Sequence, residues 1–171
     1  MYMKGLVWKR GSIGAGMGAA RAFSGARCRS RDEVYVAAVA LKGPAQLLFS
    51  LNLWDLQHFM VITKPSSSSY PLTVYDFQPQ DPESIWLAAA ALSHTKIPAG
   101  AILVRKLSKL PQRKCWFVGY TKEDADVHTF NHTWETHLLV GSHDCRHYTQ
   151  GLVEHLTGNK YILDHLRSNY L

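Results

Sequence analysis

The chain has 171 residues, of which 46% are hydrophobic and 19% are charged, and its formal net charge is +6. This length and composition favour one domain with a sizeable core over two. The basic excess does not indicate nucleic-acid binding, because residues 1–31 hold seven basic residues and no acidic one, while the rest holds 12 basic and 13 acidic. The longest charge-free apolar run, residues 85–92, is far shorter than the roughly 20 residues of a membrane span.

Residues 1–31 are basic, rich in Gly, Ala and Ser, and lack the apolar core of a secretory signal. This composition is typical of an organellar presequence, and Arg21-Ala22-Phe23-Ser24 resembles a mitochondrial processing site with cleavage after Phe23. We therefore expect a disordered presequence over residues 1–31 and a single α+β domain over residues 32–171. The mitochondrial matrix is the expected location and the chloroplast stroma the alternative. A basic tail without a targeting role stays open.

Strands and helices alternate after this leader. Strand composition is found at residues 33–41, 54–63, 72–77, 101–105, 115–120 and, more briefly, 136–140. Helices are predicted for residues 43–51 (or a turn), 81–92, about 145 to a stop at 158–159, and 160–167. The serines at 66–69 mark a turn that folds strand 72–77 back along strand 54–63. The pattern predicts an antiparallel sheet packed against helices.

One cysteine lies at a predicted helix start. In Ser142–Thr149, Cys145 has His143 and His147 beside it, and the segment runs into an apolar-periodic stretch. The partial positive charge of a first helical turn favours a thiolate, which is how a nucleophile is made. Asp144 either opposes the thiolate by like charge or caps the helix, and the sequence does not choose. The chain's three cysteines indicate no disulfide framework, and Cys115, in a strand-like run, is expected to be a small buried residue.

A cysteine nucleophile needs a base, which usually comes from far away in the sequence. His58 lies within the predicted strand 54–63, where it is either a core residue or a functional one. Folding back about the serines brings Asp76 close to His58, so Asp76 is the candidate for orienting the imidazole, or else a solvated strand-end carboxylate. Tyr75 is a weaker candidate, and Gln57 is a candidate oxyanion donor.

The order of these residues, histidine on a strand and then cysteine at a helix start, carries a resemblance. His58-Phe59-Met60-Val61 and Asp144-Cys145-Arg146-His147-Tyr148 resemble two motifs of the circularly permuted papain-like thiol enzymes. That superfamily includes lecithin:retinol acyltransferase-like proteins, cell-wall peptidases and permuted deubiquitinase-like peptidases. The resemblance implies an antiparallel sheet packed against helices with the catalytic-type cysteine at a helix N-terminus. From about residue 33 onward the chain is also similar to a plant family of unknown function.

These observations favour a thiol-dependent hydrolase or acyltransferase that uses no cofactor. Cys145 would attack an amide, ester or thioester carbonyl, with His58 as base and Asp76 as the orienting group; His143 and His147 are alternative, local bases. The substrate is unknown. A peptide, a lipid or another acyl compound would each suit the apolar rim of the site that is predicted at residues 47–60.

Two other hypotheses stay open. One is a catalytically silent papain-like scaffold that binds a protein partner in an organelle. The other is a metal-binding module, because six histidine and cysteine residues fall within twenty positions and two of the histidines are spaced four residues apart. Their spacings match no established zinc pattern, so no metal site is assigned. These six residues are His128, His132, His137, His143, Cys145 and His147.

Overall fold

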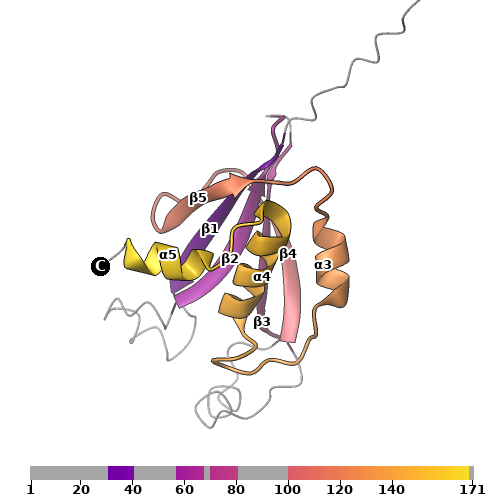
Figure 1. Ribbon diagram of the computed structural model, residues 1–171, viewed down its shortest axis with the longest axis vertical. Helices are drawn as coiled ribbons and strands as arrows, with labels where there is room; N and C mark the ends of the chain where they lie inside the picture. Colours follow the sequence, from indigo (N-terminus) through magenta and orange to yellow (C-terminus); the bar gives the residue numbers. More distant parts are fainter. Residues whose placement is uncertain (1–30, 41–56, 68–69, 81–99, 170–171) are drawn as a thin grey trace, which may run out of the picture.

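The computed structural model describes residues 31–40, 57–67, 70–80 and 100–169, and these form an α+β fold (Figure 1). Five strands make one antiparallel sheet in the order β4-β3-β2-β1-β5. The strands are β1 (Glu33–Ala40), β2 (Gln57–Lys64), β3 (Leu72–Pro79), β4 (Gly100–Leu107) and β5 (Cys115–Tyr120). The helices of the described part are α3 (Val127–Thr133), α4 (Cys145–Thr157) and α5 (Ile162–Ser168). The predicted α+β architecture with an antiparallel sheet is confirmed.

Alternation along the central strands produces two apolar layers, one on each face of the sheet. Phe59 and Val61 of β2 pack against α4 in the larger core, and Met60 and Ile62 point to the opposite face. All three helices contribute to the larger core, so they cover the same face of the sheet, as Figure 1 shows. Because both of its faces are covered, β2 is buried at its first seven positions.

The pairing between β2 and β3 is much shorter than the strands themselves. The ladder has three residue pairs, from Val61↔Tyr75 to Thr63↔Thr73. The first half of β2 still pairs with β1, as far as Ala40↔Gln57, and residues 76–79 of β3 still pair with β4. Strands β2 and β3 therefore pair with each other near the β2–β3 turn, but no ladder joins them beside the N-terminal half of β2. The N-terminus of β2, where Gln57 and His58 lie, belongs to the unpaired half.

Two predicted elements are corrected. Residues 136–140 form no strand, because the chain turns back at Gly141 (φ 91°), and Leu139 makes an isolated bridge with His143. The last helix begins at Ile162 and not at residue 160, since Tyr161 adopts a left-handed conformation with φ 55°. The expected helix stop at Gly158 is confirmed: Gly158 is the C-cap of α4, with φ 84°.

Several predictions lie outside the described residues. These are the presequence up to residue 30, the helices at 43–51 and 81–92, and residues 47–56 of the predicted rim. Within the part of the chain that the structure describes, no helix is long and apolar enough to cross a membrane.

Candidate functional site

Helix α4 begins at Cys145, and Asp144 is its N-cap. The Asp144 carboxylate accepts hydrogen bonds from the backbone N–H groups of Arg146 (3.0 Å) and His147 (3.4 Å), and its other oxygen accepts one from the Gly141 N–H (2.8 Å). These bonds satisfy donors of the first helical turn, which have no partner within the helix. Of the two roles considered for Asp144, capping is the one that the structure shows.

The charge of Asp144 is compensated locally. Burial opposes ionisation, but hydrogen bonds from the Arg146 guanidinium, the Gly141 N–H and His147 outweigh it and hold the pKa of Asp144 well below its usual range. Nδ1 of His147 lies 2.9 Å from one Asp144 oxygen, and Nη2 of Arg146 lies 2.9 Å from the other. His147 is thus engaged by the cap, which weakens it as an alternative base for Cys145.

His58 lies close to two residues from other elements of the fold, Cys145 and Asp76. The imidazole is buried and lies close enough to Cys145 to interact with its side chain, and its Nε2 is 3.5 Å from Oδ2 of Asp76. Burial alone would lower the pKa of His58, but the contacts with Asp76 and Cys145 outweigh it and raise the pKa from 6.5 to about 9. Three residues from β2, β3 and the start of α4 therefore form one connected group.

The sheet explains how His58 and Asp76 meet. Extending the β2–β3 register beyond its last pair puts both residues on one face, as diagonal neighbours, because Met60 would lie opposite Asp76. By alternation this is the face of Met60, opposite the face of Phe59 and Val61 that packs against α4. His58 and Cys145 meet at the end of the sheet where no ladder joins β2 to β3.

Asp76 is fully buried and accepts a hydrogen bond from Nη2 of Arg105 on the same oxygen that faces His58. Its Oδ1 has no hydrogen-bond partner among the described residues. A buried carboxylate needs compensation by positive charge, and Arg105 and His58 supply it. Asp76 is therefore not a solvated strand-end residue.

Two more buried side chains, one next to His58 on β2 and one a turn after Cys145 on α4, have polar atoms without partners in the described part of the chain. Gln57 is 3% exposed and, within the described part of the chain, neither its amide nitrogen nor its amide oxygen has a hydrogen-bond partner. Alternation along β2 puts Gln57 on the face of Phe59 and Val61, which α4 covers. Thr149, one turn after Cys145 on α4, is fully buried and its hydroxyl is also unpaired. Since buried polar groups are normally paired, these atoms mark a place where a polar ligand or water would be accommodated.

His143 and Tyr75 have packing roles in the structure. The His143 ring stacks on Trp134 (centroids 4.5 Å, 12°) and on His137 (4.5 Å, 22°), and its Nε2 lies 3.0 Å from the Glu135 carbonyl oxygen. His143 therefore helps to order the loop that precedes Cys145. Tyr75 packs against the larger core.

The metal hypothesis receives no geometric support. His128 and His132 are exposed on α3, and no group of three or more His, Cys, Asp or Glu side chains that could hold a metal ion occurs in the described ranges. A helix at residues 145–157 is also incompatible with ligands at 143, 145 and 147 on an extended backbone.

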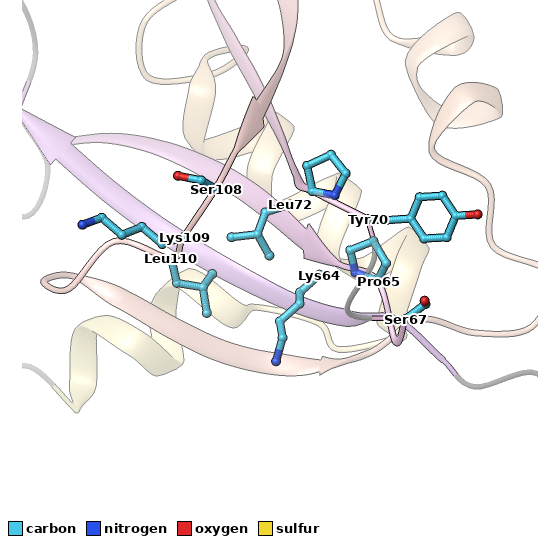
Figure 2. A pocket seen from close by; sticks show the side chains of 9 residues that line it. Lys64, Pro65, Ser67, Tyr70, Leu72, Ser108, Lys109 and Leu110 are labelled. Atoms are coloured by element: carbon cyan, nitrogen blue, oxygen red, sulfur yellow. The ribbon is translucent and has the colours of Figure 1, made fainter.

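A hollow lies at the other end of β2, away from His58. It has a volume of about 300 Å³, and Figure 2 shows its labelled side chains coming from the β2–β3 turn and from the chain after β4. Its lining is apolar with two lysines and two serines, and it includes no cysteine, histidine or carboxylate. The lining residues are Lys64, Pro65, Ser67, Tyr70, Pro71, Leu72, Ser108, Lys109 and Leu110. This hollow therefore contains none of the predicted catalytic residues.

Arg105 and Thr149 belong to the site but were not predicted from the sequence. The periodicity of α4 gives a signal for Thr149, which follows Cys145 by four residues and so lies on the same side of the helix. Arg105 has no local signal, because its contact with Asp76 depends on the β3–β4 register. Comparison of the chain with models of protein families, with curated proteins and with solved structures finds no match.

Proposed function

We propose that the protein is a thiol-dependent hydrolase or acyltransferase with Cys145 as nucleophile, His58 as general base and Asp76 as the group that orients the imidazole. The observation that carries the proposal is the contact of His58 with both Cys145 and Asp76. Covalent acyl transfer by a thiol requires a nucleophile, a base in contact with it, and a group that orients the base. The arrangement also supports the resemblance to permuted papain-like enzymes, in which a strand histidine serves a cysteine at a helix start.

In the proposed resting state the Cys145 proton has already passed to His58, and in the first step the sulfur of this thiolate–imidazolium pair attacks the substrate carbonyl carbon. The tetrahedral intermediate then collapses, the bond to the leaving group breaks, and His58 returns the proton to that group. The product is a thioester on Cys145. Water or another acceptor, deprotonated by His58, attacks the thioester and releases the acyl group.

Two donors are available for the negative oxygen of the intermediate. The backbone N–H of Cys145 is not among the groups bound by the Asp144 cap, and it lies in the first turn of α4. The Gln57 amide is buried and unpaired on the face of the sheet that α4 covers. Preorganised donors of this kind stabilise an oxyanion without reorganisation. Gln57 is therefore the proposed side-chain donor.

The proposal is tested by the alkylation of the full chain with iodoacetamide as a function of pH, with peptide mapping to separate the cysteines. We expect Cys145 to react at least about tenfold faster than Cys115 at pH 6, because a protonated His58 favours the thiolate of Cys145. The difference should disappear in His58→Ala. Equal rates at the two cysteines, unchanged in His58→Ala, would contradict the proposal and favour the silent scaffold.

Turnover is tested separately with p-nitrophenyl acetate as an acyl donor. Mixing should give a burst of p-nitrophenol that is stoichiometric with the protein, together with an acetyl group on Cys145. Cys145→Ala should give neither. Cys115→Ser is the matched control and should retain the burst, because Cys115 lies at the start of β5 in the smaller apolar layer.

A further inference from the structure

Arg105 extends the proposed site toward solvent. In the β3–β4 register, Val74 pairs with Arg105 and Asp76 pairs with Leu103, so Arg105 and Asp76 share one face of the sheet. Arg105 reaches diagonally to Oδ2 of Asp76, the oxygen that also faces His58. β4 is an edge strand of the sheet, which places Arg105 at its border.

The two partners of this ion pair differ sharply in exposure. The side chain of Arg105 is 53% exposed, whereas that of Asp76 is 1% exposed. A guanidinium has five N–H donors in a planar fork, and Asp76 engages one terminal nitrogen of Arg105. The structure therefore leaves donors of Arg105 facing solvent beside the proposed active site.

Neighbouring charged groups do not compete for these donors. Asp144 is paired with Arg146, and Lys106 turns to the other face of β4, where it donates to the Thr73 hydroxyl.

We infer that Arg105 binds a carboxylate of the substrate, so that the enzyme acts on acyl donors that carry a negative charge close to the scissile carbonyl. This inference rests on the proposed function. An arginine fork is suited to a carboxylate because it makes two parallel charge-assisted hydrogen bonds, which a neutral group of the same shape cannot match. The anchoring of Arg105 by Asp76 holds the fork in place before the substrate arrives.

The test uses two electrophiles that differ only in charge, N-bromoacetylglycine and N-bromoacetylglycinamide, on the full chain. The measured quantity is the ratio of their alkylation rate constants at Cys145, divided by the same ratio at Cys115. In the unmodified protein we expect this ratio to favour the carboxylate. Arg105→Gln should lower it at least about fivefold, since one charge-assisted contact is lost.

Lys106→Gln is the matched control, because it removes a neighbouring charge from the opposite face of β4. Its ratio should stay within about twofold of the unmodified protein, as expected for an exposed charge that makes no direct contact. An unchanged ratio in Arg105→Gln, or an equal fall in both variants, would overturn the inference. Should Arg105→Gln fail to fold, Arg105→Lys keeps the charge without the fork; its ratio should still fall, and an unchanged ratio overturns the inference.

The same data separate this inference from the proposed function. Slow reaction of Cys145 with the neutral probe, no faster than Cys115, would contradict the proposed function. If Cys145 reacts fast with both probes, whatever their charge, only the role of Arg105 is contradicted.

Discussion

The two cysteines of the described part of the chain occupy contrasting environments. Cys115 begins β5 and packs against the smaller apolar layer, and burial raises the pKa of its thiol. Cys145 begins α4 and interacts with His58, which in turn lies 3.5 Å from Asp76. The same side chain is thus an apolar packing element in one region and part of a charged group in the other. Reactivity is set by neighbouring residues and not by residue type.

The two halves of the β2–β3 pair show where these environments come from. In the paired half, from Val61 to Thr63, the strands form an ordinary ladder. In the unpaired half, Gln57, His58 and Asp76 are buried and retain polar atoms without partners. Such groups are costly to bury and are typical of functional sites. The candidate site therefore lies in the unpaired half, and the regular ladder lies in the other half.

The largest effect is expected from exchanging the two thiols for hydroxyls. Cys145→Ser should reduce acyl-enzyme formation from p-nitrophenyl acetate by about a thousandfold or more, because the nucleophile itself is lost. Cys115→Ser should change it by less than about twofold, since Cys115 lies outside the site. The measurement is the burst rate of each purified variant. Similar losses in both variants would remove the contrast between the cysteines.

Removal of the buried carboxylate should be the next largest effect. Asp76→Asn leaves Arg105 and His58 without their shared negative partner, and we expect a loss of about 3 kcal/mol in the free energy of unfolding. Urea denaturation at pH 7 measures it. Asp126→Asn is the matched control: Asp126 is the exposed N-cap of α3, and Asn caps nearly as well, so the change should stay below about 0.5 kcal/mol. Equal changes would show that Asp76 is not specially placed.

Stability should also fall on the alkaline side. The pKa of His58 is raised to about 9 in the folded protein, above its unfolded value of 6.5, so the proton stabilises the folded state. This contribution is fully present below pH 6.5 and is lost as the pH rises through 9, an effect of about 3 kcal/mol. Urea denaturation at pH 6 and 9.5, compared with His58→Gln, isolates it. A pH dependence that is identical in both proteins would contradict the raised pKa.

The smallest effect concerns the cap of the cysteine helix. Asp144→Ala removes the acceptor for the N–H groups of Arg146 and His147, and we expect it to lower the free energy of unfolding by about 1–2 kcal/mol. Asp144→Asn keeps an acceptor and should cost less. Thermal denaturation of the two variants tests the order. The reverse order would contradict the capping role of Asp144.

Much of this fold was predictable because its signals are local. β-Branched and aromatic runs indicated the strands, and the serines at 66–69 indicated the turn that brings β3 back along β2. The expected proximity of His58 and Asp76 followed from that turn, while the expected meeting of His58 with Cys145 followed from the family resemblance, and the structure brings the three together. Their catalytic role stays a prediction.

Other features depend on tertiary structure and have no local signal. The short β2–β3 ladder and the contact of Arg105 with Asp76 both follow from register, which a single sequence specifies weakly. The predicted strand at 136–140 was wrong because apolar, β-branched composition does not reveal a reversal at Gly141, where the bridge from Leu139 to His143 closes a turn. Local composition therefore predicted the candidate residues more readily than their tertiary contacts.

The most direct test of the central claim, that His58 lies against both Cys145 and Asp76, is the NMR titration of the His58 ring in the full chain. The contacts predict a pKa of about 9 for His58, and a lower pKa in Cys145→Ala, where the thiol partner is absent. A pKa close to 6.5 for His58 that is the same with and without the Cys145 thiol would contradict the account.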